Sequence, residues 1–205
     1  MKRLPLALIA LLLVATPVAD ASIARTAKTK RVPLLRLKSG KTVITPDPAF
    51  VGTLQGLSLA PTLLPPAKPS AKGAFVFPIV GGRLAGRRPA AGRILHYGGL
   101  RLSLPDGTHV DLNNPRLNDG KVARVTVQVG SGPRITLGSL DVSDAQFGLT
   151  PNVFVLDGAE LVLSGVAAQA LDTAFATTAF SAGQPVGGLA VAARIGVKLK
   201  TFETR

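Results

Sequence analysis

The side chains best suited to chemistry are gathered in one short stretch, GRILHYGGLRLSLPDGTHVDLNNP, which covers residues 92–115. It holds both histidines of the chain, His96 and His109, and the single tyrosine, Tyr97. Imidazole nitrogens bind metal ions and transfer protons near neutral pH, and a phenol oxygen donates and accepts hydrogen bonds. The stretch is therefore either a ligand or metal site, or a β-hairpin that carries these residues for structural reasons.

Alternation of apolar and polar residues predicts a β-hairpin with a defined register. Strands 99–104 and 108–112 are joined by residues 105–107, which read Pro-Asp-Gly and end on a glycine suited to a left-handed position. A three-residue loop then sets apolar residues opposite apolar ones and a cation opposite a carboxylate. The expected pairs are Leu102 with Val110 and Leu100 with Leu112 on one face, and Ser103 with His109 and Arg101 with Asp111 on the other.

The same parity separates the candidate ligands. Extended back through Gly98, it puts His96 on the apolar face and leaves Tyr97 and His109 on the polar face, roughly 20 Å apart along the strands. The two histidines then cannot converge on one metal ion, so no metal site is expected. We expect His96 to bond a backbone carbonyl at the edge of the core, Tyr97 to cover an exposed sheet face, and His109 to be a surface residue. A bulge at Gly98 would reorient His96 or Tyr97, which therefore remain the candidate ligand-binding residues.

Motifs of known catalytic sites are missing from the sequence. It contains no G-x-S-x-G, no H-E-x-x-H and no G-x-x-x-x-G-K-[ST]. Asp141 and Asp144 flank Ser143 in an expected loop, and the pattern holds no two carboxylates close together. The glycine cluster at residues 80–86 fits no phosphate-binding spacing and predicts a tight turn between strands. We expect no catalytic residues and no enzyme, and a hydrolase with Asp and His residues brought together by folding is one alternative.

The first residues predict export. Residues 1–3 are a short basic region, residues 4–14 are almost purely apolar, and Ala19-Asp20-Ala21 has the form of a signal-peptidase site, so residues 1–21 are expected to be a signal peptide. A permanent N-terminal anchor is the alternative, although the apolar run is short for a membrane-spanning helix. No later segment is long and apolar enough to span a membrane. Cysteine is absent, which excludes disulfides and a lipid-attachment cysteine. The mature chain is expected to be secreted or associated with the cell envelope.

Positive charge is concentrated in the first half of the chain. Residues 22–104 carry 14 Lys or Arg against one acidic residue, Asp47, within a net charge of +13 for the whole chain. Such a surface attracts cell-envelope polyanions or anionic lipid, and a solvated tail that aids solubility is the alternative. Specific nucleic-acid binding is not expected, because aromatic stacking platforms are missing there. The expected polyanion-binding residues are Arg25, Lys28, Lys30, Arg31, Arg36, Lys38 and Lys41.

Short strands at regular spacing predict the fold class. We expect a mainly β domain, an antiparallel β-sandwich or partly closed barrel with one or two short α-helices packed at the ends. Residues 22–41 are expected to be a basic, partly flexible N-terminal segment, and residues 42–205 a single β-rich domain with a proline-rich loop at 60–73. The expected helices are 48–56 and 164–175. The expected strands are 34–45, 74–80, 93–97, 99–104, 108–112, 121–129, 134–140, 153–156, 159–163 and 189–199.

Several segments carry a family resemblance. They are FVFPIVGGRL (75–84), AGRILHYGGLRLS (91–103), THVDLNNPRL (108–117), ITLGSLDVS (135–143) and LSGVAAQALDTAFATTAFSAGQPVG (163–187). Their succession resembles secreted actinobacterial β-rich proteins, which are similar to HtaA-type domains of cell-surface haem uptake. The resemblance implies a haem ligated by a tyrosine of an N-terminal aromatic-rich motif, with a supporting histidine in an apolar pocket. Residues 22–73 hold one aromatic residue, Phe50, so Tyr97 is the tyrosine that could replace that ligand.

Three functional hypotheses follow from these observations. The first is an exported, non-enzymatic β-domain that binds or supports a component of the cell envelope through its basic half. The second is a haem or porphyrin-binding module that uses Tyr97 with His96 nearby. The third is a hydrolase with an unrecognised site. No resident cofactor is expected under the first hypothesis, and haem is the cofactor of the second.

Overall fold

The computed structural model describes residues 34–85, 91–119 and 122–199 of the chain. The expected signal peptide and four of the expected polyanion-binding residues, Arg25, Lys28, Lys30 and Arg31, lie outside the described residues. Within the described ranges, neither helix has the length and apolar character needed to cross a membrane.

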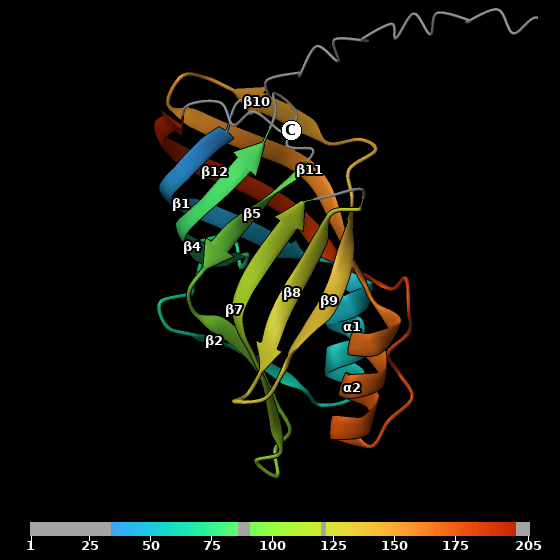
Figure 1. Ribbon diagram of the computed structural model, residues 1–205. Helices are drawn as coiled ribbons and strands as arrows, with labels where there is room; N and C mark the ends of the chain where they lie inside the picture. The colour runs from blue at the N-terminus through green and yellow to red at the C-terminus, as the bar shows by residue number, and fades with distance from the viewer. Residues whose placement is uncertain (1–33, 86–90, 120–121, 200–205) are drawn as a thin grey trace, which may run out of the picture. The chain divides into compact units, whose positions relative to one another are not determined.

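The described chain is mainly β-strand, with two short helices (Figure 1). In chain order the elements are β1 (Leu34–Pro46), α1 (Pro48–Gly56), β2 (Ala60–Leu64), β3 (Lys68–Pro69), β4 (Phe75–Ala85), β5 (Ala91–His96), β6 (Gly99–Ser103), β7 (His109–Asp119), β8 (Arg124–Val129), β9 (Arg134–Asp141), β10 (Gln146–Leu149), β11 (Val153–Leu163), α2 (Gly165–Phe175) and β12 (Pro185–Leu199).

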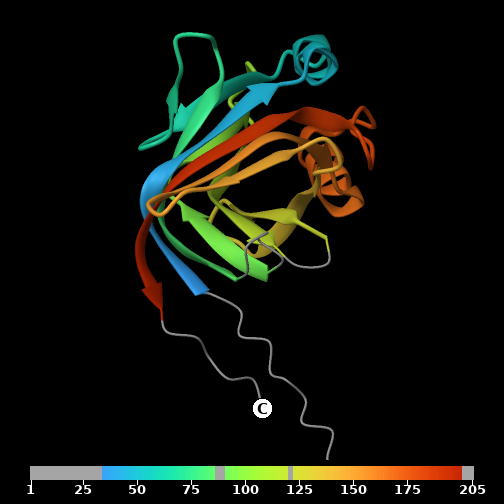
Figure 2. The same cartoon turned by 90° about the horizontal axis from the view of Figure 1, so that it is seen from above.

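The sheet closes into an antiparallel barrel of eight strands. Around the barrel the order is β7, β5, β4, β1, β12, β11, β9 and β8, and the pairing of β8 with β7 completes the ring. Seen from above, these strands curve round a common interior (Figure 2). The expected mainly β, antiparallel fold is confirmed. The pairing of β7 with β8 closes the sheet, so the fold is a barrel rather than a sandwich.

The first strand begins inside the expected basic segment. Leu35 and Leu37 are buried, whereas Arg36 and Lys38 are exposed. Side chains in this half of β1 thus point alternately into the barrel and toward solvent. A bulge between Leu37 and Ser39 interrupts its pairing with β12. Residues 34–41 therefore belong to the barrel, because their apolar side chains complete its core.

Two segments that were expected to be a loop and a turn contain strands. Residues 60–73, expected to be a proline-rich loop, contain β2, which pairs with β6, and β3, which pairs with β4. Proline is tolerated there because β2 lies at the end of the sheet order, where one edge needs no hydrogen-bond donor. The expected turn at 80–86 is also wrong, since β4 runs through Gly82 to Ala85 and pairs on both sides. A Cβ on Gly82 would lie 2.4 Å from the Arg93 carbonyl oxygen, so glycine permits this close pairing.

Two further segments differ from the expected strands. Residues 153–163 form one strand, β11, with a register shift between Leu156 and Ala159, where two strands were expected. The short strand β10 was not expected and pairs with β11. Both differences arise from pairing with neighbours that the local alternation does not reveal.

The helices begin where capping residues were expected. The Asp47 carboxylate accepts a hydrogen bond from Ala49 N, and the Ser164 hydroxyl accepts one from Ala167 N. In Figure 1 both helices are at the lower right, where α2 packs against β9 and α1 packs against β12. Their apolar residues join a second core cluster, which adjoins the barrel core through Leu137 and Val186. Its members include Phe50, Leu54, Leu102, Leu163, Leu171, Phe175 and Phe180.

Candidate functional site

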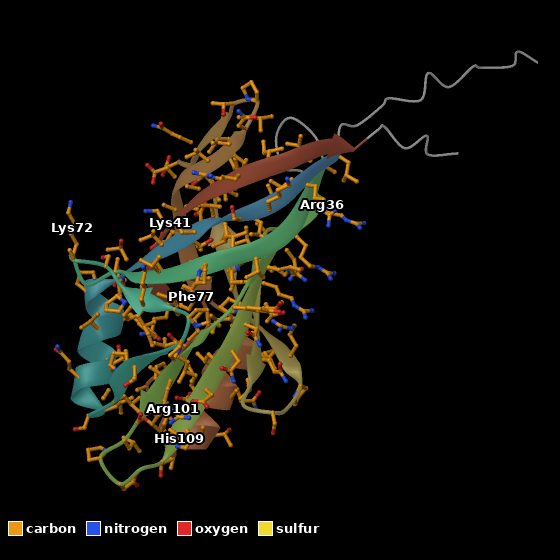
Figure 3. All side chains as sticks on the ribbon, turned by 90° about the vertical axis from the view of Figure 1, so that its left-hand side faces the viewer. Arg36, Lys41, Lys72, Phe77, Arg101 and His109 are labelled. Carbon is orange, nitrogen blue, oxygen red and sulfur yellow. The ribbon has the colours of Figure 1, made fainter. Side chains whose placement is uncertain are left out.

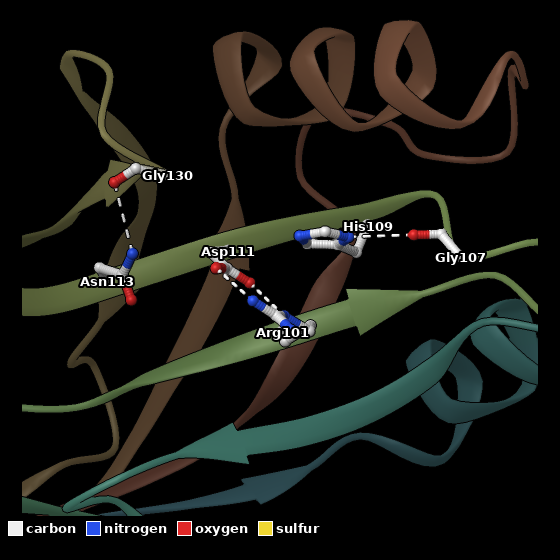
Figure 4. A network of polar contacts seen from close by, with 6 residues as sticks. All are labelled: Arg101, Gly107, His109, Asp111, Asn113 and Gly130. Carbon is white, nitrogen blue, oxygen red and sulfur yellow. Dashed lines mark hydrogen bonds and ion pairs between the residues drawn. The ribbon is translucent and has the colours of Figure 1, made fainter.

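The predicted hairpin register is confirmed. Leu102 pairs with Val110 and Arg101 with Asp111 between β6 and β7. The Arg101 guanidinium donates two hydrogen bonds to the Asp111 carboxylate, of 2.6 and 2.8 Å (Figure 4). Arg101 holds the pKa of Asp111 below its usual range, mainly through these hydrogen bonds. Asp111 is thereby engaged as an ion-pair partner.

His96 points into the barrel, as parity predicted. It is 4% exposed, and its Nδ1 lies 3.0 Å from the Pro115 carbonyl oxygen. Because a carbonyl only accepts, Nδ1 carries the proton, and Nε2 accepts a hydrogen bond from the Thr42 hydroxyl at 2.7 Å. Burial lowers the pKa of His96 to about 4, so the imidazole is neutral at physiological pH.

Tyr97 lies on the other side of the sheet. It is 59% exposed, and its backbone N–H donates to the Pro78 carbonyl at 3.3 Å. Gly98 follows in a left-handed conformation, with a φ of 87°, and leaves the alternation of β5 intact up to Tyr97. The structure therefore does not bring Tyr97 and His96 together on one face. His109 is exposed at the hairpin tip, where its Nδ1 donates to the Gly107 carbonyl (Figure 4).

The barrel interior offers little room beside His96. A space of about 10 Å³ adjoins His96, and a second, apolar cavity of about 60 Å³ lies among residues that include Phe50, Phe77 and Val127. Ligand pockets usually have volumes of about 300–1,000 Å³. No carboxylate lines either space. Within the described ranges, no cluster of His, Asp and Glu could hold a metal ion.

A larger depression lies on the outside of the barrel, over β1, β4 and β5. This cationic groove has a volume of about 890 Å³ and is open to solvent. Four of its lining residues are basic: Arg36, Lys38, Arg83 and Arg93. Its apolar lining comes from Leu34, Val80 and Leu95, and the buried Leu37 borders it from β1. Two of the expected polyanion-binding residues, Arg36 and Lys38, thus line a common groove, whereas Lys41 lies farther along β1 (Figure 3).

Strand pairing places three of these cations in a row. Arg36 is directly opposite Arg83 between β1 and β4, and Arg83 is directly opposite Arg93 between β4 and β5. Like charges directly opposite each other destabilise a sheet, and all three side chains are exposed. Local sequence reasoning missed Arg83 and Arg93, because only the pairing of distant strands reveals the row.

Known proteins resemble this chain in structure more clearly than in sequence. No protein-family model matches the chain, and no curated protein matches it either. The C-terminal domain of HtaA from Corynebacterium glutamicum aligns over 79% of this chain and 99% of that domain, with a TM-score of 0.61 and 15% identity. The N-terminal domain of the same protein aligns over 78% of this chain and 99% of that domain, with a TM-score of 0.52 and 15% identity. The chain therefore has the fold of an HtaA domain, in agreement with the resemblance seen in its sequence.

Proposed function

We propose that the protein is an exported, non-enzymatic binding module of the cell envelope that takes an anionic ligand in the cationic groove. The observation that carries this proposal is the meeting of Arg36, Lys38, Arg83 and Arg93 around one open depression. The expected signal peptide at residues 1–21 supports export.

The groove has the chemistry of an anion site. Arginine binds carboxylate and phosphate oxygens through two parallel hydrogen bonds, and three arginines line the groove. Among the residues that the structure describes, none of the four basic groove residues pairs with a carboxylate. The volume of about 890 Å³ lies within the range of pockets that hold small ligands. An anionic ligand would relieve the repulsion between Arg36, Arg83 and Arg93.

A charge-matched pair of variants tests the proposal. Arg36→Gln with Arg83→Gln removes two groove charges, and Lys68→Gln with Lys72→Gln removes two exposed charges elsewhere. Figure 3 shows Lys72 at the opposite end of the sheet from Arg36. We expect the retention of the groove variant on purified envelopes at low salt to fall at least tenfold, and the retention of the control variant to fall less than threefold.

The N-terminal basic residues need a separate arm of that experiment. Replacing Arg25, Lys28, Lys30 and Arg31 by glutamine tests whether charge before the barrel holds the protein at the envelope. If this variant loses retention while the groove variant keeps it, the groove is not the contact surface.

Haem is the second candidate ligand. Arg93 and Leu95 line the groove, and Tyr97 is the next residue of the same parity. Alternate residues of a strand point to the same face, so the exposed side chain of Tyr97 lies on the face that carries the groove. Haem joins an apolar ring to carboxylate groups, which suits a phenol, Leu95 and arginines on one surface. The structural likeness to the HtaA domains favours this candidate.

A haemin titration tests the second candidate. The chain has one tyrosine and no tryptophan, so its protein fluorescence reports Tyr97 alone. Haem ligation by Tyr97 predicts a shifted Soret band that is lost in Tyr97→Phe and kept in His109→Gln. A Soret band that is identical in the wild type and Tyr97→Phe would exclude Tyr97 as the ligand.

A further inference from the structure

A second group of cations lies beside the cationic groove, on β5, β7 and β9. It consists of Arg93, Arg116 and Arg134, called here the arginine triad. Arg93 is opposite Asn118 on β7, and Arg116 is two residues from Asn118 on the same face of that strand. Arg93 and Arg116 are therefore diagonal neighbours across the β5–β7 pair, with Cα atoms roughly 7–8 Å apart.

Arg134 reaches the same place from β9. Its Nη1 donates to the Asn114 carbonyl at 2.9 Å and to the Thr126 carbonyl at 3.0 Å. Thr126 is directly opposite Arg116 between β7 and β8. These two bonds hold the Arg134 guanidinium over the β7–β8 pair, next to Arg116. Nε and Nη2 of Arg134 make no hydrogen bond with another described residue.

Arg93 is held in place as well. Its Nε donates to Asn118 Oδ1 at 3.2 Å, and the Asn118 amide donates to Thr126 Oγ1 at 3.2 Å. Asn118 therefore orients Arg93 toward β7, where Arg116 lies. Two of the three guanidinium groups are thus fixed by neutral partners, and neither is paired with a carboxylate of a residue that the structure describes.

The three charges act on one another. Burial lowers the pKa of Arg134, and the charges of Arg116 and then Arg93 lower it further. In the part of the chain that the structure describes, Asp111 forms an ion pair with Arg101, and no carboxylate forms an ion pair with an arginine of the triad. Three neighbouring cations without a carboxylate are destabilising unless an anion joins them.

We propose that the arginine triad binds a phosphoryl group. Three neighbouring guanidinium groups offer more donors than the two oxygens of a carboxylate accept, and the additional oxygens of a phosphate match them better. The site is separate from the proposed groove ligand, because Arg116 and Arg134 do not line the groove and only Arg93 is shared. Asn118 is a positioning residue for Arg93.

Calorimetric titration of the full chain with inorganic phosphate at low ionic strength tests the site, with acetate as the carboxylate probe. We expect phosphate to bind at least tenfold more tightly than acetate. Arg116→Gln should weaken phosphate binding at least tenfold, and Arg116→Lys should restore part of it, since lysine keeps the charge without the planar fork. Arg36→Gln with Arg83→Gln should change it less than threefold, which separates this site from the groove.

Two results would overturn the proposal: phosphate binding that is unchanged in Arg116→Gln, and acetate binding as tight as phosphate binding. If Arg116→Gln does not fold, as judged by circular dichroism, Asn118→Ala replaces it, because this change keeps all three arginines and removes the carboxamide that orients Arg93. Asn118→Ala should weaken phosphate binding, and unchanged binding counts against the site in the same way.

Two further probes distinguish the sources of the phosphoryl group. Glycerol 3-phosphate presents a soluble phosphate monoester, and vesicles that contain phosphatidic acid present the same group on a lipid surface. Binding of the soluble monoester that depends on Arg116 supports a soluble phosphate ester as the natural source, and binding of vesicles alone that depends on Arg116 supports a lipid. Vesicle binding that persists in Arg116→Gln, without any binding of soluble phosphate, contradicts the site.

Discussion

The Nε2 nitrogen of His96 lies 2.7 Å from the hydroxyl oxygen of Thr42 inside the barrel. Thr42 is on β1 and His96 at the end of β5, and both strands pair with β4 rather than with each other. Through Nδ1 the same imidazole also binds the Pro115 carbonyl of β7. One neutral histidine thus links three strands of the barrel, and its protonation opposes folding.

Stability is expected to fall with acid in a window set by His96. Its pKa is lowered from 6.5 to about 4 by burial, so the unfolded chain binds a proton in this range that the folded chain does not. The stabilisation is complete above about pH 6.5 and is lost progressively as the pH falls toward 4, by about 3 kcal/mol in total. Urea unfolding at a series of pH values measures the loss.

The controls for this pH dependence are the two single histidine variants. His109→Gln should keep the loss, because His109 is exposed. His96→Gln should show a shallower dependence between pH 6.5 and 4, whatever its stability at neutral pH. An equally steep dependence in His96→Gln would assign the acid sensitivity to carboxylates.

Thr42→Val is expected to destabilise the protein by about 1–3 kcal/mol. The change keeps the shape of a 3% exposed side chain but removes the donor to Nε2, which leaves a buried acceptor without a partner. Thr45→Val on the same strand is the matched control, because Thr45 is exposed. Equal urea midpoints for the two variants would show that the hydrogen bond adds nothing to stability.

Local patterns predicted the hairpin and the helix starts correctly. The pairing of Leu102 with Val110 follows from a three-residue loop and alternation within about a dozen residues, so no distant information is needed. Asp47 and Ser164 cap their helices through side chains that act on the next residues in the chain.

The groove and the barrel closure depend on distant pairings. Arg36, Arg83 and Arg93 meet only because β4 pairs with both β1 and β5, and the Thr42–His96 contact joins residues 54 positions apart. Closure rests on the β7–β8 pairing, which depends on the twist and stagger of the whole sheet. Strand parity predicted that His96 points inward, yet it could not supply the hydroxyl that His96 meets there.

The Arg101–Asp111 ion pair is expected to contribute little to stability despite its short hydrogen bonds. Its side chains are 38% and 20% exposed, so water and salt screen their attraction. Asp111→Asn should lower the thermal unfolding midpoint by less than Thr42→Val does, and the lowering caused by Asp111→Asn should become smaller still at high salt. A double-mutant cycle with Arg101→Gln isolates the pair, and a coupling energy above that of Thr42 with His96 would contradict this ranking.

Gly98→Ala is expected to destabilise the protein by at least about 2 kcal/mol, because the left-handed φ of 87° disfavours a side chain and an added Cβ would lie 2.6 Å from Ala67 N. Gly188→Ala is the control, since a Cβ there meets nothing within 4 Å. The turn at Gly98 also holds Tyr97 on the outer face while His96 stays inside. If Gly98→Ala folds by shifting this turn, acrylamide quenching of Tyr97 fluorescence should fall below that of the wild type. A variant with unchanged stability and unchanged quenching would show that the chain reaches this arrangement without the left-handed glycine.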